Sequence, residues 1–349
     1  MGMDKMSTQF KGDNPDKLRV GVYQPSELPQ SFMVYLKNVE QNVPVGQVEF
    51  VRFQNRFDLP AQVDVLWDLR SGGGNSPVEF LMGKQPLVVT IHGFAPITLS
   101  GWDYFHSFKG VLLSKTYARK KLEAWKFSRD KVAALVTVSN FVKQEIIELI
   151  GFSENKITVC HHGASPDSFK VFRKDNHDKY FLHVSNAEPR KNLDRIISAF
   201  RRIRKSHKDV RLVLKLPKSA EPYHEDGVDV VFGLLSEVEL ATLYQGALGF
   251  LFPSLYEGFG MPILEAMACG CPVVTSSVSA CPEVAGNAAL IVDPYSIDKL
   301  FEAMEMLYFH APLRTRLINA GLERVKHFSW KVSAADHVKT FYSASYFGR

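Results

Sequence analysis

Short apolar runs alternate with longer amphipathic segments along most of the chain, and this alternation determines the expected fold. Runs such as 86–91 and 132–138 are rich in β-branched residues and lack polar alternation, which is typical of strands buried on both faces of a parallel sheet. Helical patterns occupy 111–127, 140–150 and 192–205. Repeated strand–helix alternation predicts an α/β architecture in which helices cover parallel sheets.

The alternation occurs in two blocks, separated by a polar stretch at 164–180. We therefore expect two doubly wound, Rossmann-like domains, at 18–170 and 177–329. A flexible tail over 1–17 precedes them, and a helical segment over 330–349 follows. Ligands of doubly wound sheets bind outside the carboxyl ends of the strands, so a cleft between the two domains is the expected site.

Composition agrees with a globular protein and excludes several other classes. Hydrophobic residues make up 46% of the 349 residues and charged residues 23%, which excludes a collagen-like, disordered or polytopic membrane protein. The net charge of +5 is too small to indicate a nucleic-acid partner. No apolar run approaches the roughly 18 residues of a membrane span. The four cysteines lack metal or disulfide spacing, so a reducing, cytoplasmic location is expected.

Positive charge is concentrated at 109–131. This stretch holds eight Lys and Arg residues against two acids, Glu123 and Asp130, and it includes Trp125 and Phe127. One interpretation is a solvated helix face. The other is a patch that contacts anionic lipid or a lipid-linked substrate, which would add peripheral contact with the inner face of the membrane.

The segment 252–265 carries the most chemical information. It reads Phe-Pro-Ser-Leu-Tyr-Glu-Gly-Phe-Gly-Met-Pro-Ile-Leu-Glu and leads from a buried strand into a helix. Gly258 and Gly260 allow close approach of the backbone, and Pro262 suits the first helical turn. Backbone N–H groups then point outward at a helix N-terminus, where they can bind an anion or a hydroxyl group.

Charged side chains flank this loop and the ends of two other strands. Glu257 precedes the glycines and Glu265 lies eight residues later, so one carboxylate can reach the sugar of a ligand and the other its ribose diol. Arg190 and Lys191 follow a predicted strand and suit a diphosphate. His92 ends a buried strand and is expected in the cleft. The alternatives are surface acids, an ordinary basic loop and a structural histidine.

Together these segments resemble the family-4 type of retaining glycosyltransferases, which have the GT-B fold. The family's E-x7-E motif corresponds to Glu257 through Glu265. Further matches are Pro-Arg-Lys-Asn at 189–192, Ala-Met-Ala-Cys-Gly-Cys-Pro-Val-Val at 266–274, Pro-Glu-Val-Ala-Gly at 282–286 and Phe-Ser-Trp at 328–330. The resemblance covers about 86–342. It implies two domains that face a central cleft and a last helix that crosses back onto the first domain.

The resemblance also implies a role for each charged residue. Arg190 and Lys191 would neutralise the donor diphosphate, and Glu265 would hold the ribose hydroxyls. Glu257 would hold the transferred sugar together with the four backbone N–H groups that follow it, those of Gly258, Phe259, Gly260 and Met261.

Four further positions match the family. His92 would lie over the sugar from the first domain. Ser139, a predicted helix N-cap, and Gly163 match the inner loops, and Gly233 matches the turn that supports the base. The acceptor site is not identified beyond two candidates, His92 and Ser139.

The implied mechanism is transfer with retention of the anomeric configuration and without a metal. The acceptor hydroxyl attacks from the face that the diphosphate leaves, and the departing phosphate takes the proton, so Glu257 positions the sugar rather than attacking it. No D-x-D motif occurs, and no cofactor is expected because the nucleotide-sugar is a substrate. The Pro-Arg-Lys-Asn form favours mannose from GDP-mannose, with glucose from UDP-glucose second. The implied acceptor is a saccharide or lipid-linked oligosaccharide in polysaccharide biosynthesis.

Two departures from the family pattern concern the acceptor side. The glycine-rich loop after the first strand is replaced by 23–30, and Ser165 stands where the family has Asp. The run Gly72–Gly74 either substitutes for that loop or is a plain exposed loop. Two other functions stay open: a GT-B-like sugar-nucleotide epimerase and a non-catalytic transferase-like subunit.

Overall fold

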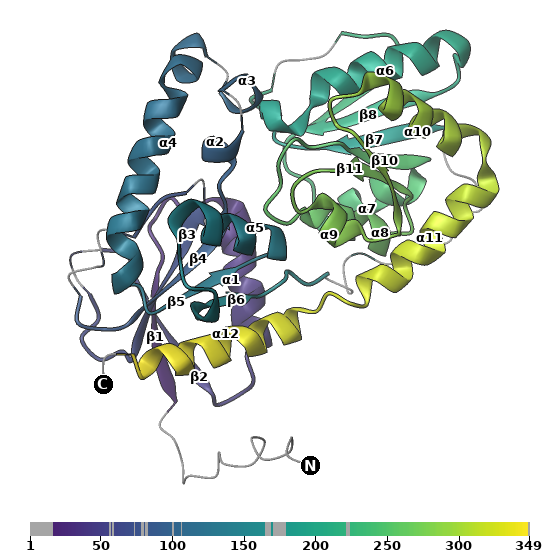
Figure 1. The fold of residues 1–349 in the computed structure, drawn as a ribbon. Helices are drawn as coiled ribbons and strands as arrows, with labels where there is room; N and C mark the ends of the chain where they lie inside the picture. The colour runs from purple at the N-terminus through teal and green to yellow at the C-terminus, as the bar shows by residue number, and fades with distance from the viewer. Residues whose placement is uncertain are drawn as a thin grey trace, which may run out of the picture.

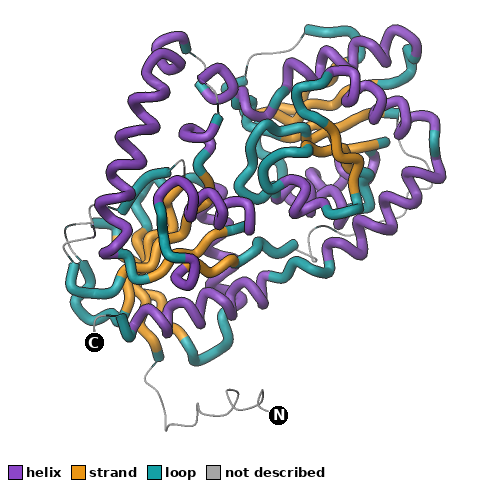
Figure 2. The backbone as a smooth tube through the Cα atoms, viewed as in Figure 1, coloured by secondary structure: helices purple, strands orange, loops and turns teal. Residues whose placement is uncertain are grey.

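The chain folds into two halves, each built on a six-stranded parallel sheet that helices cover on both faces (Figures 1 and 2). This computed structural model confirms the predicted α/β, GT-B architecture. It describes residues 17–347 except 56, 58, 73, 78, 79, 81, 82, 100, 106, 165–168, 170–178 and 221–223. The expected tail, apart from Lys17, and the departure at Ser165 lie outside the described residues.

The first sheet has the strand order β2-β1-β3-β4-β5-β6. Its strands are β1 (Leu18–Tyr23), β2 (Val48–Phe53), β3 (Val65–Gly72), β4 (Leu87–Gly93), β5 (Ala134–Thr137) and β6 (Ile157–Val159). Its helices are α1 (Gln30–Asn42), α2 (Ala95–Thr98), α3 (Gly101–Tyr104), α4 (Phe108–Ser128) and α5 (Asn140–Glu145), with short helical turns at Arg129–Lys131, Ile146–Ile150 and Glu154–Lys156.

The second sheet has the order β12-β11-β10-β7-β8-β9. Its strands are β7 (Tyr180–Val184), β8 (Arg211–Leu216), β9 (Val228–Phe232), β10 (Gly249–Phe252), β11 (Val273–Ser276) and β12 (Ala289–Val292). Its helices are α6 (Leu193–Ser206), α7 (Glu237–Gly246), α8 (Met261–Ala268), α9 (Cys281–Ala285), α10 (Ile297–Phe309) and α11 (Ala311–Val325), and a 3-10 turn, η5, spans Pro189–Lys191.

The central strands are buried on both faces, as their apolar runs predict. Every residue of β5, β10 and β11 is buried. Strand β4 is buried at every position except His92, which lies near its carboxyl end. Burial on both faces needs apolar side chains at successive positions, and this explains the absence of polar alternation in these runs.

The last helix, α12 (Trp330–Ser345), crosses back from the second half and packs against α1 of the first half (Figure 1). Trp330, Phe341 and Ala344 belong to the apolar core around Trp67 of β3. The hydroxyl of Tyr35 in α1 lies 2.5 Å from His337 Nε2. The predicted crossing is confirmed, and α12 completes the core of the first half.

Three element boundaries differ from the sequence-based expectation. Helix α4 begins at Phe108 rather than at 111, because Ser107 caps it by accepting the N–H of Gly110. The helix expected over 140–150 is α-helical to Glu145 and then forms a π turn that ends at Gly151, whose φ is +64°. Strand β3 extends through Gly72, so the glycine-rich run begins inside the sheet.

Candidate functional site

A cleft of about 880 Å³ lies between the two halves. It opens where the carboxyl ends of β3 and β4 face those of β7 and β10. Residues of both halves line it. They include Phe32, Arg70, Asn75, His92, His162, Glu188, Arg190, Lys191, Tyr256, Glu257, Gly258, Phe259, Gly260 and Met261. Most of the residues singled out in the sequence therefore share one cavity.

Arg190 and Lys191 lie on η5, directly after β7, and the chain around them is firmly anchored. Asn192 adopts the left-handed conformation, with a φ of +65°. Its side-chain amide donates to the carbonyl oxygens of Pro253 at 2.9 Å and Pro294 at 2.7 Å. The two cations are thus held against the loop that precedes α8.

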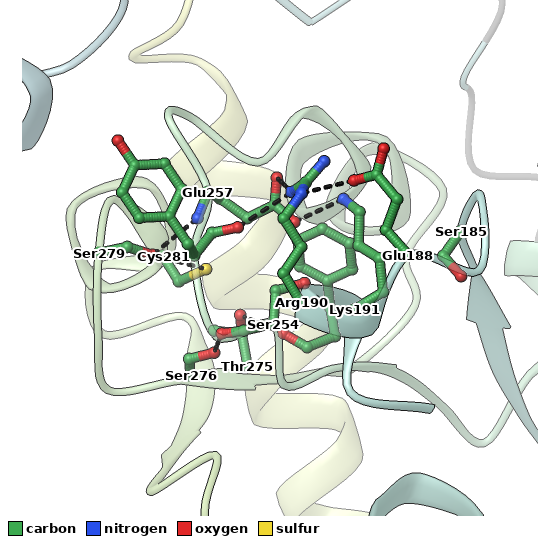
Figure 3. A network of polar contacts seen from close by, with 12 residues as sticks. Ser185, Glu188, Arg190, Lys191, Ser254, Glu257, Thr275, Ser276, Ser279 and Cys281 are labelled. Atoms are coloured by element: carbon green, nitrogen blue, oxygen red, sulfur yellow. Dashed lines mark hydrogen bonds and ion pairs between the residues drawn. The ribbon is translucent and has the colours of Figure 1, made fainter. Parts of the chain in front are cut away.

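Glu257 accepts from both cations, so the three charged residues form one buried cluster (Figure 3). Its Oε1 lies 2.5 Å from Lys191 Nζ, and its Oε2 lies 3.2 Å from Arg190 Nη1. Arg190 Nε also pairs with Glu188 at 2.6 Å. Burial opposes ionisation of Glu257, but the charges of Lys191 and Arg190 outweigh it and lower its pKa. The carboxylate is therefore ionised at neutral pH.

Hydroxyl groups beneath the cluster fix the backbone that carries Glu257 (Figure 3). The backbone N–H of Glu257 donates to Ser279 Oγ at 3.0 Å. Thr275 donates to the carbonyl of Phe252 at 3.0 Å, and Ser276 donates to that of Ser254. These bonds tie the loop after β10 to the end of β11, so the position of Glu257 is set by the sheet.

Glycine is needed at 258 and at 260 for different structural reasons. Gly260 precedes α8 with a φ of +101°, which few other residues adopt. Gly258 touches the other half: a Cβ atom there would lie 1.8 Å from the carbonyl oxygen of His92. Close backbone approach was expected at Gly258, and the partner in the structure is the carbonyl end of β4.

His92 is a neutral imidazole, and one of its ring nitrogens is already hydrogen-bonded within the protein. Its Nε2 donates to the carbonyl oxygen of Leu69 at 3.0 Å, since a carbonyl can only accept. Burial lowers the pKa of His92 to about 4, against the effect of that hydrogen bond. Phe32 stacks on the ring at 4.7 Å between centroids. The arrangement leaves Nδ1 as a hydrogen-bond acceptor on the wall of the cleft.

Ser139, the other acceptor candidate, does not line the cleft. It caps α5 as predicted by accepting the N–H of Val142 at 3.1 Å, and it donates to the carbonyl of Gly258 at 2.6 Å. Its hydroxyl therefore joins the two halves, and a contact of Ser139 with an acceptor stays a prediction. Gly163 packs beneath α12, where a Cβ atom would lie 2.2 Å from the backbone nitrogen of Trp330.

Glu265 and Gly233 also lie away from the described wall of the cleft. Glu265 is one helical turn beyond Met261 on α8 and accepts from the hydroxyl of Tyr244 at 3.2 Å. Burial raises the pKa of Glu265 to about 7, against that hydrogen bond. Gly233 forms the turn after β9, with a φ of +93°. Their roles toward a nucleotide stay predictions.

Tyr256 is a functional contact that the sequence analysis missed. Its hydroxyl reaches into the first half, where it accepts the N–H of Phe94 at 2.6 Å and donates to the carboxylate of Glu145. Thr98 donates to the other oxygen of Glu145 at 2.7 Å. Tyr256 stands next to Glu257 in the motif, but nothing local in the sequence indicates a partner 111 residues away.

Glu283 is a second missed contact between the halves. Its carboxylate accepts the backbone N–H groups of Asn140 at 2.8 Å and Phe141 at 2.9 Å, at the N-terminus of α5. His161 Nε2 lies 2.8 Å from the same carboxylate. Glu283 belongs to the Pro-Glu-Val-Ala-Gly match, so the motif marks this residue without revealing its partner.

Two absences in the described ranges concern membrane spanning and metal binding. Within them, no helix is both long enough and apolar enough to cross a bilayer. The same part of the chain holds no group of three or more His, Cys, Asp or Glu side chains placed to bind a metal ion. Independence from metal stays a prediction.

Comparisons with known proteins address the family. The model for glycosyl transferases group 1 matches residues 164–324, and the model for glycosyltransferase family 4 matches residues 62–168. The O-antigen chain mannosyltransferase B of Escherichia coli is 31% identical over 224 residues, which cover 58% of this chain and 59% of that protein. The O-antigen chain mannosyltransferase RfbU of Salmonella typhimurium is 29% identical over 224 residues, covering 61% and 62%. The chain thus spans less than two thirds of each relative's length.

The solved structures agree on the fold. HepE from Anabaena, solved in complex with UDP and glucose, superposes with a TM-score of 0.68 at 14% identity and covers 93% of this chain and 100% of that one. The two family models adjoin and together extend over 62–324. With this sequence match and this architecture, the chain belongs to the family-4 glycosyltransferases of the GT-B fold.

Proposed function

We propose that the protein transfers a hexose from a nucleotide-sugar to a hydroxyl of a saccharide or lipid-linked acceptor, with retention and without a metal. The observation that carries this proposal is the buried cluster of Arg190, Lys191 and Glu257 beside the start of α8, opposite His92 in the shared cleft. Mannose from GDP-mannose is the favoured donor, because the relatives of 31% and 29% identity are both named mannosyltransferases. Glucose from UDP-glucose is the alternative.

The two cations stabilise the negative charge that develops on the donor during transfer. Negative charge grows on the diphosphate as the bond from the sugar to phosphate breaks, and Arg190 and Lys191, which line the cleft, stabilise that charge. A bound diphosphate competes with Glu257 for these cations. Glu257 is then released to accept a hydrogen bond from a hydroxyl of the sugar, which orients the sugar beside the leaving group.

His92 acts from the opposite wall. As a neutral imidazole with Nε2–H bound to Leu69, it offers only Nδ1 to a ligand, so it accepts a hydrogen bond from a sugar hydroxyl. Its low pKa makes it a weak base, and the departing phosphate is the better proton acceptor for the attacking hydroxyl. His92 is therefore a positioning residue in this proposal.

The proposal also includes peripheral membrane contact through α4. One face of this helix exposes Phe108, Leu112 and Phe127, which are 73%, 70% and 62% exposed. The same face carries four cations, Lys109, Lys115, Arg119 and Lys126, and one acid, Glu123. Exposed apolar side chains beside cations suit an anionic bilayer surface, where each cation contributes about 1 kcal/mol. Such contact fits a cytoplasmic enzyme with a lipid-linked acceptor.

Thermal unfolding with GDP, UDP and ADP tests the donor. A nucleotide at about 100 times its Kd stabilises by about 2.7 kcal/mol. We expect GDP to stabilise the wild type and to have less effect on Glu265→Ala, and the anomeric configuration of the product, read by NMR, should match that of the donor. Stabilisation by none of the nucleotides, or an inverted product, would overturn the proposal. Donor conversion without acceptor and without nucleotide release would indicate the epimerase instead.

A further inference from the structure

A second cavity lies beside the cleft, in the first half of the chain. Its volume is about 450 Å³. It lies between the segment that ends β3 and the middle of α4, and its wall is formed by Asp68, Arg70, Ser71, Asn75, Ser76, Lys120, Lys121 and Ala124. Ser71 and Asn75, which flank the glycine-rich run in the sequence, therefore line a cavity.

The wall of this side pocket is cationic. Three of its residues are positively charged, Arg70, Lys120 and Lys121, and one is negatively charged, Asp68. Asp68 is buried and forms a two-pronged ion pair with Arg70, at 2.9 and 3.1 Å. Lys120 forms no ion pair with any residue that the structure describes. After Asp68 has neutralised one cation, two positive charges remain.

The polar groups of the side pocket are held in place by the fold. The guanidinium of Arg70 lies 4.1 Å from the centroid of the Tyr23 ring. Lys121 donates to the side-chain oxygen of Asn75. The loop that carries Asn75 is tied to α4, because Trp125 Nε1 donates to the carbonyl oxygen of Gly74 at 2.9 Å. Arg70 and Lys121 are therefore partly ordered before an anion binds, which lowers the entropic cost of binding.

The side pocket adjoins the main cleft. Arg70 and Asn75 line both cavities, so the two cavities adjoin at these residues. Arg70 and His92 lie on the wall of the cleft that the first half forms. Arg190 and Lys191 lie on the wall that the second half forms. The two groups of cations therefore lie on opposite halves of the molecule.

We propose that the side pocket binds a phosphate or diphosphate group of the acceptor. This inference rests on the proposed function, since it names the chemical class of the acceptor for the same cleft. Arg70, Lys120 and Lys121 hold the phosphate oxygens, with Ser76 and Asn75 as further polar partners. The acceptor hydroxyl is thereby directed toward His92, while the phosphate stays outside the donor site. A lipid-linked saccharide diphosphate and a soluble sugar phosphate share this chemistry.

Binding of inorganic pyrophosphate tests the site directly. The full chain is saturated with the nucleotide that stabilises it most, and pyrophosphate is titrated by calorimetry. We expect Lys120→Gln/Lys121→Gln to weaken binding about tenfold, and Lys120→Arg/Lys121→Arg to retain it. The matched control is Lys37→Gln/Lys331→Gln, which removes two exposed lysines from outside both cavities and should stay within about twofold of wild type.

Equal binding by the wild type and Lys120→Gln/Lys121→Gln, or no binding by the wild type, would overturn the inference. Lys191 is intact in all of these variants, so the comparison does not depend on which donor is used. The nucleotide series of the proposed function is measured separately on the wild type and Glu265→Ala. A failed donor proposal is therefore distinguishable from a failed acceptor site.

Transfer assays then identify the source of the phosphate. The acceptors are a polyprenyl-diphosphate-linked saccharide in detergent, a sugar 1-phosphate and a neutral methyl glycoside. We expect Lys120→Gln/Lys121→Gln to raise KM for a phosphorylated acceptor about tenfold, with kcat and the KM of the methyl glycoside unchanged. Use of the lipid-linked acceptor alone assigns the site to lipid diphosphate, and use of the sugar phosphate assigns it to a soluble acceptor. An equal KM change for all three would overturn the inference.

Discussion

Lys191 Nζ lies 2.5 Å from Glu257 Oε1, and each of these residues is only 8% exposed. A buried pair of this kind is weak evidence for stability, but removal of one partner leaves the other charge uncompensated. The pair therefore connects the proposed donor site with the stability of the second half. Effects on folding and on catalysis must be separated when either residue is changed.

We expect Lys191→Met and Glu257→Gln each to destabilise the protein by about 3 kcal/mol, because each leaves a buried charge without its main partner. The double variant should recover most of that loss, since it removes both charges. Its transfer activity should stay low. Thermal unfolding and initial rates on the same samples separate the two effects, and additive losses of stability would contradict the pairing.

Gly258→Ala should impair transfer through the contact between the halves. The added methyl group would lie 1.8 Å from the carbonyl oxygen of His92, so the two halves must move apart. We expect a larger radius of gyration by small-angle scattering and a loss of kcat, with nucleotide binding to the second half retained. Gly46→Ala is the control: its φ of +85° strains the backbone locally, but a methyl group there meets no atom within 4 Å and cannot push the halves apart. Wild-type scattering from Gly258→Ala would refute the steric argument.

Glu265→Gln should raise stability at alkaline pH while weakening nucleotide binding. Burial raises the pKa of Glu265 from 4.5 to about 7, so the folded protein holds this proton more tightly than the unfolded chain. Glu265 then lowers stability progressively as pH rises from 4.5 to 7, and the loss is complete above pH 7. The variant should gain up to about 3 kcal/mol at pH 8 and little at pH 4.5. A gain that does not depend on pH would contradict this pKa.

Loss of exposed apolar side chains from α4 should weaken membrane contact. We expect Phe108→Ser/Leu112→Ser to reduce co-sedimentation with anionic vesicles about tenfold, while its rate on a soluble acceptor is unchanged. Phe309→Ser serves as the control, because Phe309 is 56% exposed at the end of α10 in the other half. Equal binding to neutral and anionic vesicles would show that the cations of α4 do not contribute.

The sequence predicts well which charged residues share the cleft, because the features that place them are local. Arg190, Lys191 and Glu257 follow buried strands and His92 lies near the carboxyl end of one, and parallel sheets bring such ends to one edge. Glu265 belongs to the same motif, but one further helical turn carries its side chain to Tyr244. Spacing along the chain predicts which residues lie near a motif. Which of their side chains line the cavity depends on the rotation of each helix about its axis.

The contacts between the halves could not be predicted, because no local pattern encodes them. The N-cap of Ser139 is visible in the sequence, but its bond to Gly258 joins residues 119 positions apart. The same holds for Tyr256 with Glu145 and for Glu283 with the N-terminus of α5. The side pocket also escapes prediction, since Arg70 and Lys120 become neighbours only when α4 packs beside β3.

Helix α12 has a consequence for the order in which the protein can fold during synthesis. Tyr35 and His337 are partners although 302 residues separate them, and Trp330 and Phe341 cover the core around Trp67. The first half therefore leaves the ribosome with an uncovered apolar face and keeps it until the second half has been translated. Contacts of such high sequence separation slow folding and expose the nascent chain to aggregation. The same helix makes the two halves unfold together, because melting of either removes an anchor of the other.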